Sequence, residues 1–190
     1  MLESRQILSC TAALLMSAPA IAALTEWSRA SNGNGHYYEA VRSDTSVTWE
    51  QARALAEARG GYLATLTSAA ENAFVLSLVS GQPQYWSNTY GGPWLGGYQP
   101  NPNSPAASGW EWVTGESWSF TNWASGEPGD QGLQGGKESY LHFVNLSGTW
   151  NDFTNDGNAT YSYIVEYVPS PGGLPLLVAL LGVSGRRRKN

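Results

Sequence analysis

Five side chains that can offer oxygen ligands gather in one stretch of the chain, between residues 123 and 152. They are Glu127, Asp130, Glu138, Asn151 and Asp152. Calcium takes six to eight oxygens from carboxylates, amide carbonyls and water. The same stretch holds no cysteine and one histidine, so no His/Cys cluster favours zinc or another borderline metal. The residue types leave two interpretations open, a calcium site and acids scattered over a surface.

A proline adds a conformational argument for the calcium site. Pro128 directly follows Glu127 and stands close to Asp130. Cis peptide bonds are essentially a feature of proline. A cis bond before Pro128 would turn the oxygen donors on either side of it toward one place.

Two helices are predicted in the first half of the body. Thr48 is an N-cap with Gln51 three residues later, as in a capping box, and the helix begins at Trp49. Its apolar face is expected to include Ala52, Leu55, Ala56 and the stem of Arg59, and Gly60-Gly61 ends it. Thr67 or Ser68 caps the second helix, whose buried stripe is expected to be Phe74, Val75, Leu78 and Val79.

Short strands separated by long, turn-rich loops dominate the remainder. The expected strands cover residues 36–41, 62–66, 94–98, 110–113, 140–144 and 163–167. Two helices combined with short strands predict an α+β domain. Long loops in a compact domain usually carry function, which agrees with ligands placed on them.

Charge and composition narrow the functional classes. The 190 residues predict one domain with targeting segments at its ends, and their formal net charge is −5. Without the charged residues of the two ends, five basic and 14 acidic residues remain, a charge of about −9. Such a body repels nucleic acid and anionic lipid, and neither is expected as a partner. The single cysteine, Cys10, lies in the predicted leader, so the body has no disulfide.

The N-terminal end is predicted to be a secretory signal peptide covering residues 1–23. Arg5 supplies positive charge, residues 7–16 form a short apolar region, and Ala20-Ile21-Ala22 gives a small-x-small cleavage pattern. The alternative interpretation is a buried N-terminal helix. The signal peptide implies export.

Residues 168–190 form the C-terminal end. A breaker-rich linker covers residues 168–173, an apolar segment covers 174–183, and Arg186, Arg187, Arg188 and Lys189 follow. The apolar segment is shorter than the roughly 20 residues of a membrane-spanning helix. This layout resembles the PEP-CTERM class of bacterial sorting signals, in the variant that begins Val-Pro-x-Pro, with Ser170 as a departure.

That resemblance implies processing by a membrane protease of the exosortase type. It also implies a Gram-negative source, a place at the cell envelope surface or in the extracellular matrix, and membrane contact only through the tail. The alternative is a tail that is merely apolar and sticky.

The predicted domain covers residues 24–167, and its part from about His36 to Tyr167 resembles the C-type lectin-like domain family. The matching motifs, in family order, are Trp49-Glu50-Gln51-Ala52, Gly61-Tyr62-Leu63-Ala64-Thr65-Leu66, Glu71-Asn72, Trp94-Leu95-Gly96-Gly97, Trp110-Glu111-Trp112, Asn122-Trp123, Glu127-Pro128, Trp150-Asn151-Asp152 and Val165-Glu166-Tyr167. The resemblance implies two helices, small antiparallel sheets and a long loop region that binds calcium at one principal site.

The same resemblance assigns roles to the candidate residues. Glu127 matches the first ligand of a Glu-Pro-Asn motif, Glu138 matches an acid before the following strand, and Asn151 and Asp152 match a ligand pair. The Asn of the motif is Gly129 in this chain, so its role is shifted to Asp130. The core cysteines of the family fall at Ala56 and Val165, which fits a version without disulfides.

The implied function is calcium-dependent binding of a glycan or exopolysaccharide, in which two neighbouring sugar hydroxyls coordinate the ion. The Glu127-Pro128 pair resembles the mannose/glucose type more than the galactose type. The alternative is a surface or matrix adhesion protein that binds protein, with calcium only structural. An enzyme is not expected. The body has two histidines and no thiol, which gives little support to nucleophilic catalysis. Glu127 and Glu138 could form the carboxylate pair of a glycosidase, but a role as calcium ligands explains them better.

The aromatic residues and histidines receive structural interpretations. Core positions are expected for Trp49, Trp94, Trp112, Trp123 and Trp150. Trp86 and Trp118 have two possible interpretations: they pack in the core, or their rings are exposed and stack on a sugar. His36 and His142 are interpreted as structural histidines.

Overall fold

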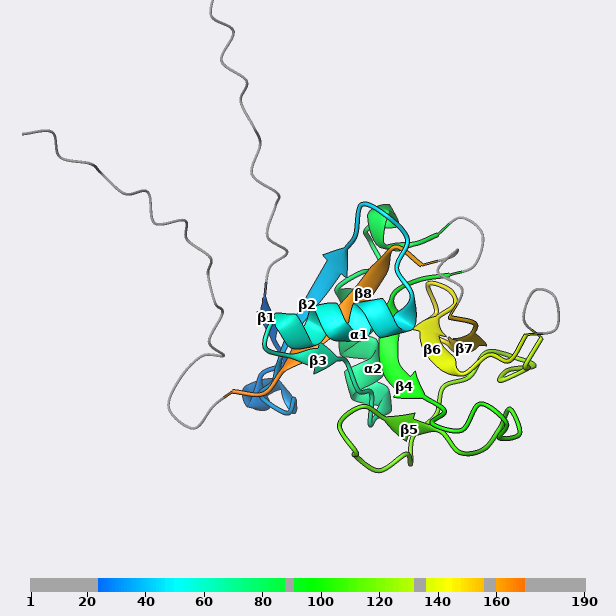
Figure 1. Cartoon of the computed structure of the whole chain (residues 1–190). Helices are drawn as coiled ribbons and strands as arrows, with labels where there is room; N and C mark the ends of the chain where they lie inside the picture. Colours follow the sequence, from blue (N-terminus) through cyan, green and yellow to red (C-terminus); the bar gives the residue numbers. More distant parts are fainter. Residues whose placement is uncertain (1–23, 88–90, 132–135, 156–159, 170–190) are drawn as a thin grey trace, which may run out of the picture.

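The computed structural model describes residues 24–87, 91–131, 136–155 and 160–169 (Figure 1). The predicted signal peptide and almost all of the predicted sorting tail lie outside these residues. Within the described residues, no helix is long and apolar enough to cross a membrane.

One sheet of eight strands forms the centre of the fold, in the order β1-β2-β8-β4-β6-β7, with β3 paired to β8 and β5 paired to β4. The strands are Thr25–Glu26 (β1), Tyr37–Arg42 (β2), Tyr62–Leu63 (β3), Trp94–Tyr98 (β4), Glu111–Trp112 (β5), Tyr140–Phe143 (β6), Trp150–Phe153 (β7) and Ser162–Tyr167 (β8). Their pairing is antiparallel except between β4 and β8, which meet in parallel at Trp94 and Tyr163. The expected α+β class is therefore confirmed, and this parallel contact joins the antiparallel pieces into one mixed sheet.

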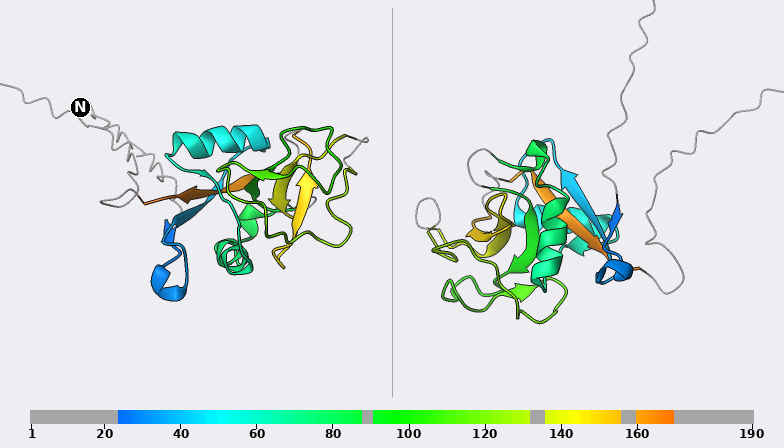
Figure 2. Two further views of the ribbon diagram at one scale, coloured as in Figure 1. Left: turned by 90° about the horizontal axis from the view of Figure 1, so that it is seen from below. Right: turned by 180° about the vertical axis from the view of Figure 1, so that it is seen from behind.

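Two helices cover opposite faces of the sheet (Figure 2). Helix α1 is Trp49–Ala58, and both hydrogen bonds of the predicted Thr48–Gln51 capping box are present. Helix α2 is Ala69–Ser77, and of the two candidate caps Ser68 is the one that accepts from the Glu71 N–H. Two short 3₁₀ helices, η1 (Arg29–Ser31) and η2 (Pro83–Tyr85), complete the elements.

Strand β8 divides the core into two clusters because its side chains alternate between the two faces. Ile164 belongs to the first cluster, with Tyr38, Val75 and Trp150. Val165 belongs to the second cluster, together with Trp49, Ala56, Leu63 and Trp94. Ala56 and Val165, which occupy the positions of the family's cysteines, are thus packed in the same apolar cluster.

The tryptophans expected in the core are mostly buried, and one leucine expected on the buried face of α1 is not. Trp49, Trp94, Trp112 and Trp150 are buried as expected, and Trp123 packs against the first cluster while remaining partly exposed. Trp86 and Trp118 also pack against that cluster, so they are not free-standing rings for sugar. The expectation for Leu55 was wrong: it is 43% exposed, because α1 buries only the narrow face of Trp49, Ala52 and Ala56.

Candidate functional site

The loop that carries Glu127 is held beside the first residue of β7. Ala124 N–H donates to the Trp150 carbonyl over 2.8 Å, and Trp150 N–H donates to the Asn122 carbonyl over 2.8 Å. A few residues further along, the Glu127–Pro128 peptide bond is cis. These contacts bring the loop to the strand that carries Asn151 and Asp152.

Asp152 is the buried centre of this region. Its side chain is fully buried, and its two carboxylate oxygens accept the N–H groups of Gly129 and Asp130, each over 3.0 Å. A Cβ atom at Gly129 would lie 2.7 Å from Glu127 Oε2. The glycine at the motif position therefore lets the loop approach the Glu127 carboxylate closely.

Asp130 fastens the two ends of the loop to each other. One of its carboxylate oxygens accepts the Glu138 N–H over 3.3 Å, and the other forms an ion pair with Lys137. Its backbone lies in the left-handed region, with φ of 52°. Asp130 thus positions Glu138. Its predicted role as a direct calcium ligand stays a prediction.

Four carboxylates repel one another in this region. Burial raises the pKa of Glu138 to about 7, and the nearby charges of Asp152, Glu127 and Asp130 contribute in the same direction. Burial also raises the pKa of Glu127, and the charge of Asp152 and a hydrogen bond with it add to the effect. Because like charges disfavour the ionised forms, a cation among these side chains would be stabilised.

Asn151 makes its contacts apart from the four carboxylates. Its Nδ2 atom lies 3.3 Å from His142 Nε2, and it also donates to the Asp152 carbonyl. His142 is fully buried, and burial lowers its pKa to about 4, so the ring is neutral near pH 7. The structural interpretation of His142 agrees with this environment, and the ring fixes the carboxamide of Asn151 at the strand.

The structure therefore brings together Glu127, Asp130, Glu138 and Asp152, while Asn151 adjoins them through the main chain of Asp152. Within the described part of the chain, no three His, Cys, Asp or Glu side chains stand in an arrangement that could already hold a metal ion. The hydrogen bonds give the reason: the oxygens of Asp152 and Asp130 face N–H groups and Lys137 instead of a common centre. The donor set is nevertheless composed of hard oxygens, which fits calcium chemically.

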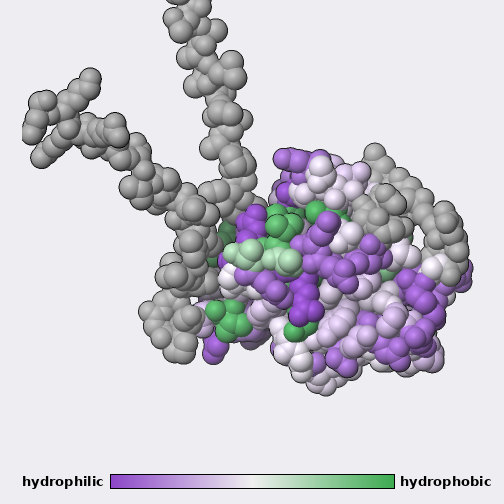
Figure 3. All heavy atoms as spheres, viewed as in Figure 1, coloured by the Kyte–Doolittle hydropathy of each residue, from purple (hydrophilic) through white to green (hydrophobic). Residues whose placement is uncertain are grey.

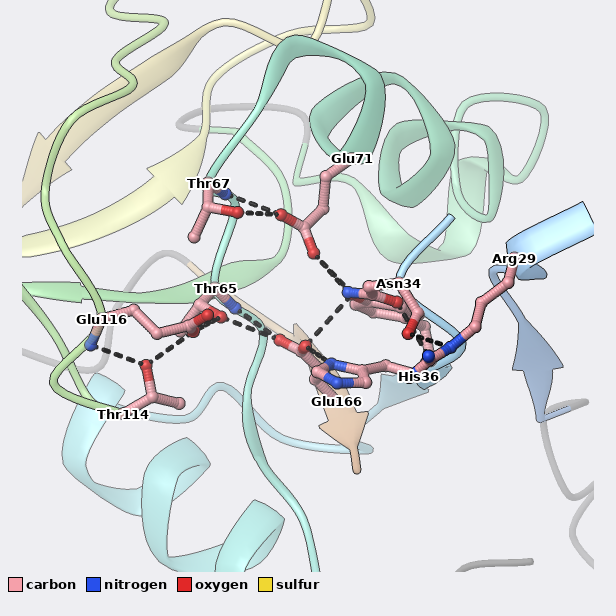
Figure 4. A network of polar contacts seen from close by, with 10 residues as sticks. Arg29, Asn34, His36, Thr65, Thr67, Glu71, Thr114, Glu116 and Glu166 are labelled. Carbon is pink, nitrogen blue, oxygen red and sulfur yellow. Dashed lines mark hydrogen bonds and ion pairs between the residues drawn. The ribbon is translucent and has the colours of Figure 1, made fainter. Parts of the chain in front are cut away.

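A second group of acids lies in the core and was not expected from the sequence (Figure 4). Glu71 and Glu166 are 2% and 1% exposed. Tyr38 O–H lies 2.7 Å from Glu71 Oε1 and 3.1 Å from Glu166 Oε1. Thr67 N–H and O–H donate to Glu71 Oε2, and Thr65 N–H and O–H donate to Glu166 Oε2. Because each buried oxygen has a donor, this network is structural.

His36 closes the network from its outer side. Its Nδ1 atom lies 2.6 Å from Glu166 Oε1, so the predicted structural role of His36 agrees with the contact. This hydrogen bond raises the pKa of His36 above its ordinary value of 6.5, with the charges of Glu166, Glu71 and Glu116 contributing. Stability from the pair is fully present below the unfolded pKa and is lost as pH rises through the folded pKa.

We therefore expect His36→Gln to destabilise the domain by about 1–2 kcal/mol at pH 5.5 and by distinctly less at pH 9. Urea unfolding in excess chelator at several pH values measures the difference between the two proteins. Titration of the other acids occurs in both proteins and cancels in that difference. A gap that stays constant with pH would show that the His36 charge contributes nothing.

The chain is similar to known proteins in both sequence and fold. The Lectin C-type domain model matches residues 45–163. The chain belongs to this family. The matched residues of the C-type lectin domain include all five candidate ligands, both helices and strands β3 to β7.

One sequence relative is Halomucin from Haloquadratum walsbyi, which is 34% identical over 161 residues. The alignment covers 74% of this chain and 2% of Halomucin, so the chain corresponds to a small part of that protein. The activity of Halomucin as a whole therefore cannot be assigned to this chain.

Two solved structures show the same fold. The cow CD23 carbohydrate-recognition domain, determined in the presence of GlcNAc2Man3 oligosaccharide, has a TM-score of 0.58 and 19% identity, covering 81% of this chain and 98% of that one. A calcium-independent type II antifreeze protein has a TM-score of 0.54 and 19% identity, covering 80% of this chain and 95% of that one. At these identities the likeness concerns the fold, so the ligand has to be argued from the residues of this C-type lectin domain.

Proposed function

We propose that this C-type lectin domain binds carbohydrate in a calcium-dependent manner. The observation that carries the proposal is that Glu127, Glu138 and Asp152 lie close enough together for burial and the charge of Asp152 to raise the pKa of Glu127 and of Glu138. Acids placed at random on a surface have no reason to gather in this way. A divalent cation offsets that repulsion, and membership of the family makes sugar the expected class of ligand.

A bound calcium ion would supply coordination positions for two neighbouring hydroxyls of the sugar. The protein supplies the groups that select them: the carboxylates of Glu127 and Glu138 accept hydroxyl protons, and the carboxamide of Asn151 donates an N–H that it releases from His142 or from the Asp152 carbonyl. His142 and the Asp152 carbonyl hold that carboxamide at β7. Asp130, paired with Lys137, keeps the Glu138 backbone against the loop.

Calcium binding at this site requires a local rearrangement of side chains, and the present hydrogen bonds show which ones are involved. Each Asp152 oxygen keeps a lone pair beside its N–H donor, so the ion can share these oxygens with Gly129 and Asp130, while Glu127 has to turn from Gly129 toward the ion. These changes concern side chains of one loop and one strand. We therefore propose that the domain folds without calcium and that the ion orders the loop.

The direct test replaces one carboxylate with its amide. We expect Glu127→Gln to weaken calcium binding at least tenfold, or about 1.4 kcal/mol or more, and to weaken binding of mannose in calcium equally. Isothermal titration calorimetry measures both. The matched control is Glu111→Gln on β5, whose side chain is exposed and lies outside the cluster. Equal calcium affinity in the two variants would refute the site.

A glycan array with and without chelator identifies the sugar. If calcium raises the melting temperature and no sugar adds to the shift, the adhesion alternative with a structural ion replaces the lectin proposal. No substrate turnover is proposed, in keeping with a binding domain.

We further propose that the protein is exported and displayed at the envelope surface or in the matrix of a Gram-negative bacterium. The proposal rests on the sequences of residues 1–23 and 168–190. Display of many copies would raise the avidity of a single shallow sugar site. Mass spectrometry of the protein recovered from its source tests whether both ends are cleaved.

A further inference from the structure

A cavity of about 300 Å³ opens between helix α1 and the neighbouring ends of β4 and β6. Its lining includes Trp49, Glu50, Arg53, Glu57, Tyr98 and Tyr140. Ligand pockets in proteins span roughly 300–1,000 Å³, so this cavity is suited to one ring-sized group. None of the five candidate calcium ligands contributes to its lining.

The base of the cavity is aromatic. The Trp49 ring is buried and lies 5.3 Å from the Tyr98 ring and 4.9 Å from the Tyr140 ring, measured between centroids. Both tyrosines are only partly buried, so each presents ring surface to the cavity. Aromatic faces are negative and attract the weakly positive C–H bonds of a saturated ring.

The rim of the cavity is polar. Arg53 Nε donates to Glu57 Oε1 over 2.9 Å, while its guanidinium lies 5.9 Å from the centroids of both Trp49 and Tyr98. Tyr140 O–H donates to Glu50 Oε1 over 3.4 Å. Two carboxylates and a guanidinium offer acceptors and donors within one small opening, which suits a ligand with several hydroxyls.

The charges decide between classes of ligand. The two carboxylates and one guanidinium leave the rim negative, in a body that is itself acidic, so a phosphate or an acidic sugar is disfavoured. An organic cation is disfavoured as well, because the Arg53 guanidinium lies 5.9 Å from the ring centroids of Trp49 and Tyr98 and repels a second cation there. A neutral hexose, with a C–H face and a ring of hydroxyls, matches both the base and the rim.

We propose that this cavity is a second sugar-binding subsite that works without calcium. Tyr140 follows Glu138 by two residues, which span at most about 7 Å of chain. A polysaccharide held by one hexose at the cavity can therefore place another hexose near Glu138. This last step rests on the proposed calcium site, while occupation of the cavity itself does not.

The experiment titrates the full chain with maltohexaose and cellohexaose in excess EDTA, followed by nuclear magnetic resonance of the backbone amides. We expect binding of at least one hexasaccharide, with shifts in α1 and at Tyr98 and Tyr140. The dissociation constant should rise at least fivefold in Tyr98→Ala and in the double variant Glu50→Gln/Glu57→Gln. It should be unchanged in Tyr161→Ala, which removes an exposed tyrosine elsewhere.

The double variant keeps the test valid if Tyr98→Ala unfolds, because both glutamates are exposed on α1. Absence of binding in EDTA, or equal losses in Tyr161→Ala, would overturn the subsite. Glu127→Gln separates the two proposals: it should keep the binding seen in EDTA and lose only the calcium-dependent part. If Glu127→Gln leaves binding in calcium intact while Tyr98→Ala still weakens it in EDTA, the calcium site fails and the subsite stands.

Discussion

Trp150→Ala unfolds the domain. The Trp150 side chain is fully buried, and its ring lies within 6 Å of the rings of Trp112, Trp118, Phe120 and Trp123. Removal of a buried tryptophan costs about 3–5 kcal/mol. The loss of its 2.7 Å hydrogen bond to Asn72 Oδ1 leaves a buried acceptor and adds roughly 1–3 kcal/mol. Total stabilities of domains are about 5–15 kcal/mol, so a combined loss of about 4–8 kcal/mol removes most or all of the stability of a domain in the lower half of that range.

Circular dichroism and urea unfolding measure this effect. Trp150→Phe is the matched variant, because it keeps an aromatic ring in the cluster and removes the donor to Asn72. We expect it to remain folded with a stability lower by roughly 1–3 kcal/mol. A native-like unfolding midpoint for Trp150→Ala would contradict the proposed importance of the cluster.

Asp152→Ala abolishes calcium binding and, with it, sugar binding. The Asp152 carboxylate accepts the N–H groups of Gly129 and Asp130 and lies close enough to Glu127 and Glu138 to raise the pKa of both. The substitution removes a central ligand and releases the loop, so we expect calcium affinity to fall at least 100-fold, or about 2.7 kcal/mol. Calorimetry with calcium measures the loss, and Asp44→Asn, an exposed acid outside the site, is the control.

A second readout shows whether Asp152 acts through its charge. In chelator, removal of that charge should lower the pKa of Glu138 from about 7 toward its ordinary value, because the repulsion decreases. Carbon-detected nuclear magnetic resonance of the glutamate carboxyl groups follows that titration. An unchanged Glu138 pKa together with unchanged calcium affinity would remove Asp152 from the site.

Local signals in the sequence predicted most of the elements. The Thr48–Gln51 capping box predicted the beginning of α1, the alternation of aromatic and small residues predicted β2, and short apolar segments predicted β4, β6 and β8. Strand β7 was not predicted as a strand, because its polar Asn151 and Asp152 interrupt the apolar pattern. Strand β3 is shorter than expected, since only Tyr62 and Leu63 pair with β8.

The sequence predicted which residues form the candidate site, but it predicted few of the hydrogen bonds that these residues make. Motif order pointed to Glu127, Glu138 and Asp152, which the structure brings together. The pairing of His142 with Asn151 depends on the register between β6 and β7, which local sequence does not encode. The burial of Glu71 and Glu166 was not predicted, because Tyr38, which donates to Glu71, and Thr65, which donates to Glu166, are distant from them in the sequence.

The placement of Ala56 and Val165 in one apolar cluster has a practical consequence. With the only cysteine of the chain at position 10, residues 24–167 have no covalent cross-link to form, break or shuffle. Their folding is indifferent to the redox state of the surroundings, so production in a reducing cytosol needs no oxidant or isomerase. Stability at this position therefore depends on side-chain packing alone, and substitutions there change the free energy of unfolding without any help from a covalent bond.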